Sequence, residues 1–338
     1  MKKVLAIIPA RSGSKTVINK NIRLMAGKPM MAYSIDHALR SEYINRVIVS
    51  TDSEEYRRIA LEYGAEAPFL RPKELAGDSS LDIEVFEHAL EFLREMEGYI
   101  PDIVVHLRPT YPVRNVKDID NTIRILLENE TIDSVRCITK TENTPYKMWK
   151  KEDDGKLIPL LNDIVEAYNM PRQQLPVIYI QNACIDVIRT DTIVNKHSMT
   201  GENIYGYEMK ENVDIDTEEE FIRAEQIIRC KNGTNTYVID IDGVIAKYNA
   251  SLNYEESKPN FEMINLINKI YDMGNEIILF TARGYKTGKD WKEVTENQMR
   301  QWGVKYSKLL FNKPSADFYL DDHNISLRQI KQIWSREG

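Results

Sequence analysis

Short apolar runs that alternate with helical patterns restrict most strongly how this chain can fold. A run of about four to eight apolar residues bounded by turn signals is typical of a strand buried on both faces. Strands that alternate with helices form a doubly wound sheet, so we predict a mostly parallel, Rossmann-like α/β fold. The predicted strands are residues 4–8, 46–50, 67–70, 103–107 and 134–139, and the predicted helices are residues 30–41, 54–63 and 116–129.

The first predicted strand ends at Pro9 and leads into a small, basic loop. Sheets of this kind bind ligands beyond the carboxyl ends of their strands, which is where the loop falls. Small residues let a backbone pass close to a ligand, and bases neutralise negative charge. The loop therefore suits a polyphosphate, and a solvated basic turn fits it equally well. The residues concerned are Arg11, Ser12, Gly13, Ser14, Lys15 and Lys20.

The composition is that of an ordinary globular protein and argues against nucleic-acid and membrane partners. The chain has 338 residues, enough for two domains, with 42% hydrophobic and 29% charged residues. Its net charge of −7 argues against a nucleic-acid partner. The apolar run near the start ends by Arg11, too early for a signal peptide, and no later run could span a membrane. Cys137, Cys184 and Cys230 lie far apart, so we expect reduced thiols and a cytoplasmic protein.

The segments IIPARSGSK, KNI and GKPM at the start of the chain resemble the N-acylneuraminate cytidylyltransferase family. Members of this family resemble sugar nucleotidyltransferases in fold, couple CTP to a 2-keto sugar acid and release pyrophosphate. The resemblance implies a CTP site in the basic loop, with Lys15 and Lys20 taking part in catalysis. The implied CTP-binding residues are Arg11, Gly13, Ser14, Lys15, Lys20 and Asn21.

Two later segments extend this resemblance. Residues 70–78 match the part of the family that closes over cytosine, which implies that Arg71 donates to the base. The alternative is a surface arginine fixed by the proline that follows it. The segment RPTYPVR at 108–114 resembles a family loop and directs Arg108 toward the acceptor. His106 precedes this loop and is expected to be a satisfied core residue. We assign no nucleotide role to Asp82.

Three further residues are implied to bind substrate. Lys147 lies in a family loop whose lysine faces the reacting groups. Arg172 lies in a segment that commonly comes from the partner subunit, which implies a homo-oligomer, either a dimer or a tetramer. Asn182 matches a family asparagine, but Ile180 stands where many sialate enzymes carry arginine. Isoleucine cannot bind a carboxylate, so the sequence argues against sialic acid itself as the acceptor.

Asp214 and Asp216 are candidate ligands of Mg²⁺. Two carboxylates two residues apart on an extended segment face the same side and can hold the ion. The alternative is a capping box of Thr217 and Glu220 on the helix that starts at Glu218. Considered alone the residues favour the cap. Their place in a cytidylyltransferase-like chain favours the metal, and the two roles are compatible.

A polar linker at 231–235 separates a second predicted domain. Its motifs DIDGV, TARG, NKP and YLDD resemble those of haloacid dehalogenase superfamily phosphatases. This implies that Asp240 attacks phosphorus and that Asp242 acts as acid and base. Thr281 and Lys313 would bind the phosphoryl group. The implied Mg²⁺ ligands are Asp240, Asp242, Asp321 and Asp322.

The sequence therefore predicts a cytidylyltransferase domain at 1–232 and a smaller α/β phosphatase-like domain at 233–338. The predicted partners are CTP and a small acidic sugar or sugar phosphate, without nucleic acid or membrane. Two alternatives stay open. The acceptor could be an octulosonate or a phosphorylated capsule precursor, and the second domain could be an oligomerisation module. A nicotinamide-binding enzyme is set aside because its glycine fingerprint is missing.

Overall fold

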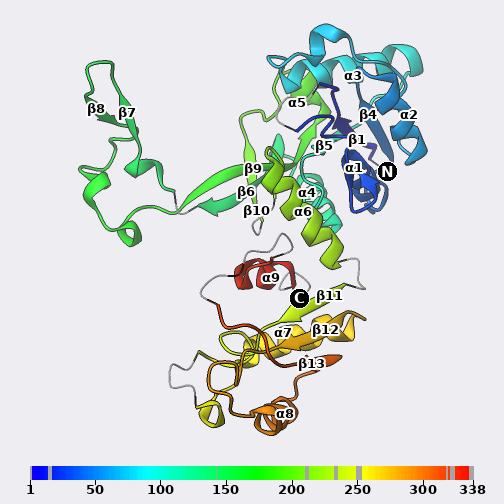
Figure 1. Ribbon diagram of the computed structural model, residues 1–338. Helices are drawn as coiled ribbons and strands as arrows, with labels where there is room; N and C mark the ends of the chain where they lie inside the picture. Colours follow the sequence, from blue (N-terminus) through cyan, green and yellow to red (C-terminus); the bar gives the residue numbers. More distant parts are fainter. Residues whose placement is uncertain are drawn as a thin grey trace. The chain divides into compact units, whose positions relative to one another are not determined.

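The computed structural model describes residues 2–13, 17–141, 143–209, 213–231, 235–248, 253–316, 319 and 324–334. Two compact units make up the chain, residues 1–225 and 226–338. The division falls within helix α6 (Glu218–Lys231), whereas the sequence predicted a boundary after residue 232. Each unit has its own sheet and its own helices (Figure 1).

A six-stranded sheet forms the centre of the first unit, in the order β10-β6-β9-β5-β1-β4. β1 pairs in parallel with β4 and β5, and β10 pairs in parallel with β6. β9 runs antiparallel to both β5 and β6. The predicted mostly parallel sheet is therefore confirmed, with one reversed strand. The strands are β1 (Val4–Pro9), β4 (Arg46–Ser50), β5 (Ile103–His106), β6 (Ser134–Thr141), β9 (Ile178–Arg189) and β10 (Ile204–Glu208).

Helices lie on both faces of this sheet, so its central strands are buried on both sides (Figure 1). Alternate residues of β1 belong to different cores: Ala6 and Ile8 to one, Leu5 and Ile7 to the other. This double burial is why β1 reads as an unbroken apolar run. The helices are α1 (Met30–Leu39), α2 (Glu54–Glu62), α3 (Asp82–Glu97), α4 (Val116–Glu128), α5 (Thr190–Val194) and α6.

The strand predicted at 67–70 is wrong. Only Glu66 forms a bridge there, with Ile48 of β4, and the chain then continues without strand pairing. Pro68 has no N–H to donate to a neighbouring strand, which ends the pairing after one residue. A short 3₁₀ helix, η1 (Lys73–Ala76), and then helix α3 follow. α3 was not among the predicted elements, although it carries one face of the site.

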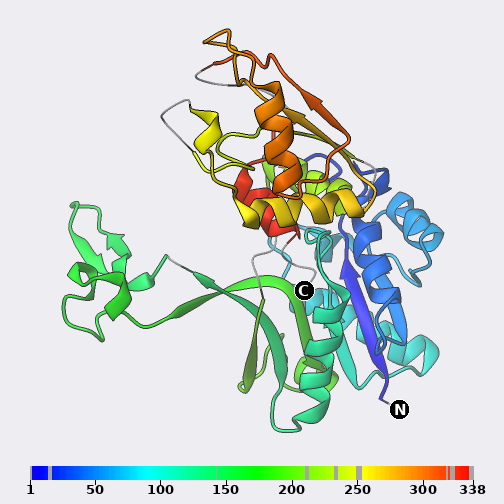
Figure 2. The ribbon, with the colours of Figure 1, turned by 90° about the horizontal axis from the view of Figure 1, so that it is seen from below.

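β6 and β9 continue beyond the sheet into a projecting arm, as both views show (Figures 1 and 2). The arm has a small core of its own formed by Tyr146, Ala167 and Leu175. A two-stranded hairpin of β7 (Trp149–Lys151) and β8 (Leu157–Pro159) lies at its far end. Short 3₁₀ turns connect these parts: η2 (Pro145–Lys147), η3 (Ala167–Asn169) and η4 (Arg172–Gln174). A second hairpin, of β2 (Leu24–Met25) and β3 (Lys28–Pro29), precedes α1.

The second unit contains a three-stranded parallel sheet in the order β11-β12-β13. Its core includes Ile267, Ile270, Ile277 and Leu279, all fully buried. The strands are β11 (Thr236–Ile239), β12 (Glu276–Phe280) and β13 (Lys308–Leu310); the helices are η5 (Tyr254–Glu256), α7 (Phe261–Asp272), α8 (Lys292–Gln301) and α9 (Leu327–Trp334). Across the described residues of both units, every helix is too short or too polar to cross a membrane.

Candidate active site

A pocket of about 270 Å³ opens at the carboxyl ends of β1 and β5 in the first unit. Three groups of side chains line it: bases from the loop after β1, residues of the 71–82 segment, and the loop after β5. This is the position at which a doubly wound sheet binds its ligand. The lining residues that carry charge are Arg11, Lys20, Arg71, Asp78, Asp82 and Arg108.

The basic loop is held to the end of β4 by a carboxylate. Asp52 accepts hydrogen bonds from the Ser12 backbone N–H at 2.8 Å and from the Ser12 hydroxyl at 2.7 Å. Burial raises the pKa of Asp52, but the Ser12 hydrogen bonds, the backbone N–H of Asp52 and the charge of Arg71 together lower it overall. Gly13 has a φ of +82°, a conformation that favours glycine. Of the predicted loop residues, Ser14 and Lys15 lie outside the described part of the chain.

Lys20 and Asn21 are positioned at the other side of this loop. The Lys20 ammonium donates to the Ile215 carbonyl at 2.7 Å and to an Asp216 carboxylate oxygen at 3.1 Å. Asn21 donates to the Arg11 carbonyl at 3.0 Å. Lys20 thus joins the basic loop to the Asp214–Asp216 segment, which lies 195 residues further along the chain.

Asp214 and Asp216 lie beside the pocket and also belong to a capped helix start. Asp214 accepts a hydrogen bond at 2.9 Å from the hydroxyl of Tyr111. Thr217 and Glu220 exchange hydrogen bonds as a capping box at the start of α6. The cap is therefore present. Asp216 keeps a side chain that is 70% exposed, so its carboxylate stays accessible to an ion.

Arg71 is not the surface arginine that the alternative interpretation described. It is 5% exposed and donates to the Ser50 carbonyl at 2.6 Å and to the Ser50 hydroxyl at 3.1 Å. Burial lowers its pKa to about 10, against the opposing effect of Asp52 and Asp82. The side chain lines the pocket from a fixed position at the end of β4.

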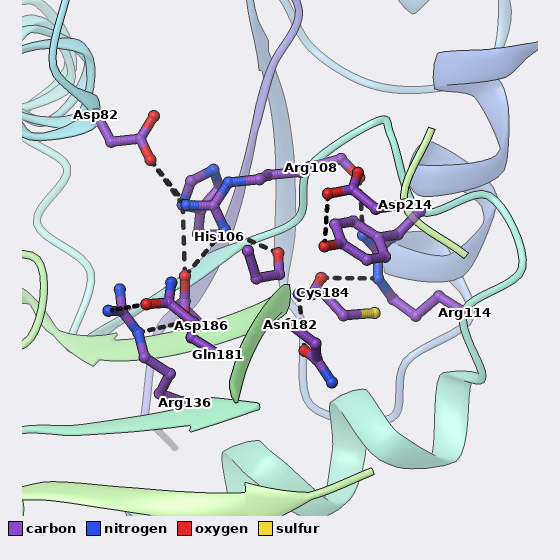
Figure 3. A network of polar contacts seen from close by, with 12 residues as sticks. Asp82, His106, Arg108, Arg114, Arg136, Gln181, Asn182, Cys184, Asp186 and Asp214 are labelled. Atoms are coloured by element: carbon purple, nitrogen blue, oxygen red, sulfur yellow. Dashed lines mark hydrogen bonds and ion pairs between the residues drawn. The ribbon is translucent and has the colours of Figure 1, made fainter. Parts of the chain in front are cut away.

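Arg108 is the centre of a polar network at the end of β5 (Figure 3). It donates to Asp186 at 3.0 Å and to the Ala183 carbonyl at 2.8 Å through Nη1, and to Asp82 at 2.8 Å through Nη2. Arg136 approaches Asp186 from the opposite side, at 2.9 Å. Arg108 was predicted from the sequence, whereas its partners Asp82 and Asp186, and the second base Arg136, were not.

Strand register explains how this network forms. Asp186 of β9 lies directly opposite His106 of β5 on one side and Arg136 of β6 on the other. Three polar side chains thus stand side by side on one face of the sheet, where α3 begins at Asp82. The signal that could have revealed them was a charged or polar residue within an otherwise apolar strand.

His106 is buried, as predicted, but it is not satisfied. Its exposure is 0%, and neither ring nitrogen has a hydrogen-bond partner among the described residues. Nδ1 lies 4.0 Å from carboxylate oxygens of Asp82 and Asp186. Burial, and then the positive charge of Arg108, lowers the pKa of His106 well below its usual range.

The other predicted acceptor residues are placed differently. Asn182 donates to Thr139 at 2.9 Å and accepts from the Cys184 N–H at 3.1 Å, so its side chain links neighbouring strands. Lys147 and Arg172 lie in the arm, outside the pocket lining. Lys147 donates to the Tyr168 carbonyl at 3.0 Å. A single chain therefore does not bring these two bases to the pocket.

A second cluster lies at the carboxyl ends of the strands of the second unit. Lys313 donates to Asp240 at 2.9 Å, and its backbone N–H donates to the Thr281 carbonyl at 3.1 Å. Arg283, which the sequence analysis did not single out, donates to both oxygens of Asp242, at 2.8 and 2.9 Å. Metal binding or proton transfer at Asp242 would compete with this pair for the carboxylate oxygens. Asp321 and Asp322, the other predicted ligands, lie outside the described residues.

The buried Arg283 is held by its surroundings. Its Nη1 donates to Thr295 at 3.2 Å and Gln298 at 2.7 Å, both on α8. The Tyr254 ring lies 4.7 Å from the Arg283 guanidinium, and the Tyr319 ring lies 4.5 Å from the Lys313 ammonium. Each aspartate of the pair is thus neutralised by a base that also contacts a tyrosine. No group of three potential metal ligands occurs among the side chains described in either unit.

Residues 5–242 of the chain match the sequence profile of the cytidylyltransferase family. The chain belongs to this family. The matched region contains the pocket, the polar network and the Asp214–Asp216 segment.

Three relatives support the assignment of this cytidylyltransferase. Post-translational flagellin modification protein B of Campylobacter coli is 33% identical over 234 residues, 69% of this chain and 97% of that protein. CMP-N,N′-diacetyllegionaminic acid synthase of Legionella pneumophila is 32% identical over 230 residues, 67% of this chain and 96% of the relative. N-acylneuraminate cytidylyltransferase of Escherichia coli is 33% identical over 234 residues, 68% of this chain but only 53% of the relative.

Among solved structures, CMP:2-keto-3-deoxy-manno-octonic acid synthetase in complex with CTP has a TM-score of 0.51. It is 16% identical, and the match covers 68% of this chain and 99% of that structure. At this identity the match shows the fold alone. The nucleotidyltransferase-like α/β fold predicted for the first part of the cytidylyltransferase is thereby confirmed.

Proposed function

We propose that this cytidylyltransferase transfers CMP from CTP to a 2-keto sugar acid related to the nonulosonic acids. The observation that carries the proposal is a single pocket in which Arg11, Lys20 and Arg71 lie close to Arg108. The first three suit a nucleotide triphosphate, and Arg108 suits the carboxylate of an acceptor. Two relatives named for legionaminic acid and N-acylneuraminate support this acceptor class.

In the proposed reaction, a hydroxyl oxygen of the acceptor attacks the α-phosphorus of CTP and pyrophosphate leaves. The bond to the α-phosphorus forms as the bond to the bridging oxygen breaks, and the hydroxyl proton passes to solvent or base. Arg11 and Lys20 stabilise the charge that develops on pyrophosphate. Arg71 is held rigidly by Ser50, so it orients the nucleotide without a change of rotamer.

The carboxylates of Asp214 and Asp216 fit Mg²⁺. Both groups are hard oxygen ligands, and the Asp216 side chain is 70% exposed beside Lys20. Mg²⁺ is usually held by one or two carboxylates together with substrate phosphates. Bound there, the ion would neutralise phosphate charge. Lys20, which lines the pocket, donates to an Asp216 oxygen at 3.1 Å and so joins this carboxylate to the pocket.

The test is CTP-dependent pyrophosphate release with a panel of acceptors. The panel contains N-acetylneuraminate, N,N′-diacetyllegionaminate, pseudaminate, an octulosonate, and several sugar and polyol phosphates. We expect turnover with a nine-carbon acid, preference for CTP over ATP, and poor turnover of N-acetylneuraminate because Ile180 replaces an arginine. Turnover of phosphates alone would overturn the acceptor assignment, and equal use of ATP would overturn the donor assignment.

We also propose that two copies of the chain associate through the arm. The arm exposes many large apolar side chains for a segment with so small a core, and exposed apolar patches of this kind mark interaction sites. Lys147 and Arg172 lie on the same arm, so a partner copy could supply them to the pocket. The exposed residues are Met148, Trp149, Leu157, Ile158, Leu160, Leu161, Val165, Val177, Tyr179 and Ile180.

Sedimentation of the full chain tests this arrangement. We expect a dimer or a tetramer for the natural sequence, and a smaller species for Leu157→Glu combined with Ile158→Glu. Leu61→Glu, on the exposed face of α2, is the matched control. A monomeric natural protein, or an unchanged assembly in the double variant, would exclude the arm as the contact.

A second candidate function, a Mg²⁺-dependent phosphatase, is proposed for residues 233–338. One observation favours it: Asp240, Thr281 and Lys313 meet at adjacent strand ends, as a phosphoryl site requires. Asp240 would attack phosphorus and release the alcohol, and water would then release phosphate from the aspartyl group. The Lys313 ammonium is placed to bind a phosphoryl oxygen. The rival proposal is an oligomerisation module without activity.

Asp240→Asn in the full chain separates these proposals. It should abolish Mg²⁺-dependent phosphate release from an aryl phosphate and leave CTP-dependent pyrophosphate release intact. Asp272→Asn, an exposed aspartate paired with Lys305, is the control. Natural protein that is inactive on a broad panel of sugar and polyol phosphates would favour the oligomerisation module. Loss of both activities in Asp240→Asn would show that the two units are coupled.

A further inference from the structure

The Arg108 network contains two carboxylates that differ sharply in burial. The Asp186 side chain is 1% exposed, whereas the Asp82 side chain is 46% exposed and lines the pocket. Asp186 accepts hydrogen bonds from two arginines, Arg108 and Arg136. In the network of Figure 3, Asp82 accepts a hydrogen bond from Arg108, and Nδ1 of His106 lies 4.0 Å from it. The two aspartates therefore anchor Arg108 with very different strength.

Removal of Asp186 would leave two arginines without their shared anion in a largely buried position, which is strongly unfavourable. Separation of Asp82 from Arg108 is much easier, because an exposed ion pair contributes only about 0.2–1 kcal/mol. Arg136 is in turn held by Gln181 at 2.9 Å. Asp186 and Arg136 thus fix the position of Arg108, and Asp82 is its exchangeable partner.

Position in the pocket decides what can take the place of Asp82. Its carboxylate binds Nη2 of Arg108, and both residues line the pocket. An incoming carboxylate can replace it with the same charge and the same hydrogen-bonding geometry. His106, whose Nδ1 lies 4.0 Å from Asp82, is buried, and burial lowers its pKa. The ring therefore stays neutral, and it does not compete with Arg108 as a positive charge that attracts the incoming anion.

We propose that Asp82 is a specificity-determining residue that occupies Arg108 until the carboxylate of the acceptor displaces it. The inference rests on the proposed acceptor class. An acceptor without an anionic group cannot compensate for the lost Asp82–Arg108 pair, so its binding is weakened by about two- to fivefold. An anionic acceptor binds at the expense of that pair, so Asp82 also weakens its binding.

The nucleotide side of the pocket offers a matched pair. Arg11 binds Asp78 at 2.8 Å, with side chains that are 36% and 52% exposed. A phosphate of CTP is expected to displace Asp78 in the same way as the acceptor displaces Asp82. The two exchanges concern different substrates, so variants of the two aspartates should affect different Michaelis constants.

Steady-state kinetics of Asp82→Asn, with the best acceptor of the panel, tests the proposal. Asparagine keeps the shape and removes the charge, so KM for the acceptor should fall about two- to fivefold, the value of an exposed ion pair. KM for CTP and kcat should stay within twofold of the natural enzyme, and Asp82→Glu should restore KM. Asp78→Asn should instead lower KM for CTP, and Glu62→Gln, on the surface of α2, controls for loss of a charge.

An unchanged or raised KM for the acceptor in Asp82→Asn would overturn the proposal. A lowered KM for CTP would also overturn it, because Arg108 would then serve the triphosphate. Failure of the natural enzyme on every sugar acid would count against the proposed function instead. Modification of Arg108 by phenylglyoxal, mapped by mass spectrometry, needs no acceptor. It should be about two- to fivefold faster in Asp82→Asn, and an unchanged rate would show that Asp82 does not restrain Arg108.

Discussion

His106 should make the first unit less stable in mild acid. The side chain is 0% exposed, and both ring nitrogens lack a hydrogen-bond partner within the described structure. Its ring packs against Phe86, with 4.6 Å between the ring centroids. Burial, and then four nearby arginines, oppose a further positive charge and lower the pKa of His106 in the folded state.

The magnitude follows from proton linkage. In the unfolded chain histidine titrates near a pKa of about 6.5, whereas His106 in the folded chain stays neutral far below that value. Above pH 6.5 neither state binds the proton, so the free energy of unfolding is at its full value. Below it the unfolded chain alone is protonated, and stability falls by about 1.4 kcal/mol for each pH unit. At pH 5.5 the loss is about 1.4 kcal/mol.

The variant His106→Leu removes this titration and fills a similar volume. The difference in unfolding free energy between variant and natural protein should therefore shift by about 1.4 kcal/mol, in favour of the variant, from pH 7.5 to pH 5.5. Amide hydrogen exchange of peptides from β5 reports the opening of this unit apart from residues 226–338. Contributions of all other titrating groups cancel in the difference between the two proteins.

The control is His197→Leu, which removes a histidine whose side chain is 74% exposed. Parallel pH profiles for the natural protein and His106→Leu would refute the reasoning. They would mean that His106 takes up a proton in the folded state, by pairing with Asp82 or Asp186.

Three other outcomes are expected. Asp216→Ala should lower the rate of CTP-dependent pyrophosphate release at least a hundredfold, which corresponds to about 2.7 kcal/mol in activation free energy. Asp153→Ala, on the exposed arm, is the control. An active Asp216→Ala variant would contradict the metal role. Arg108→Ala should raise KM for the acceptor more than KM for CTP, and the reverse order would move Arg108 to the nucleotide. Gly201→Ala should destabilise the first unit by about 2–4 kcal/mol, because the added Cβ would lie 2.4 Å from Asp133 and φ is +70°. Urea unfolding measures the loss. Gly155→Ala is the control that separates the contact from backbone strain, because nothing lies within 4 Å of its Cβ position.

The sequence by itself determined the helices and strands in which apolar residues recur with a regular spacing. Buried strands at β1, β4, β5 and β6 follow from apolar runs, and α1, α2 and α4 follow from helical spacing. The basic loop and the Asp214–Asp216 segment were recognisable because their residues are close together along the chain. The prediction of a strand at 67–70 was wrong because Pro68, which has no N–H for strand pairing, outweighs the strand preference of its apolar neighbours.

Only the tertiary structure decided how the charged residues of the site are paired. Asp82, Arg108 and Asp186 come from three elements, and sequence distances of 26 and 78 residues separate Arg108 from its two carboxylates. Their contact depends on the register of the reversed strand β9, which places Asp186 between His106 and Arg136. The pairing of Arg283 with Asp242 likewise spans 41 residues. Local patterns report which face of an element is buried, whereas the partner of a buried charge depends on which strands become neighbours.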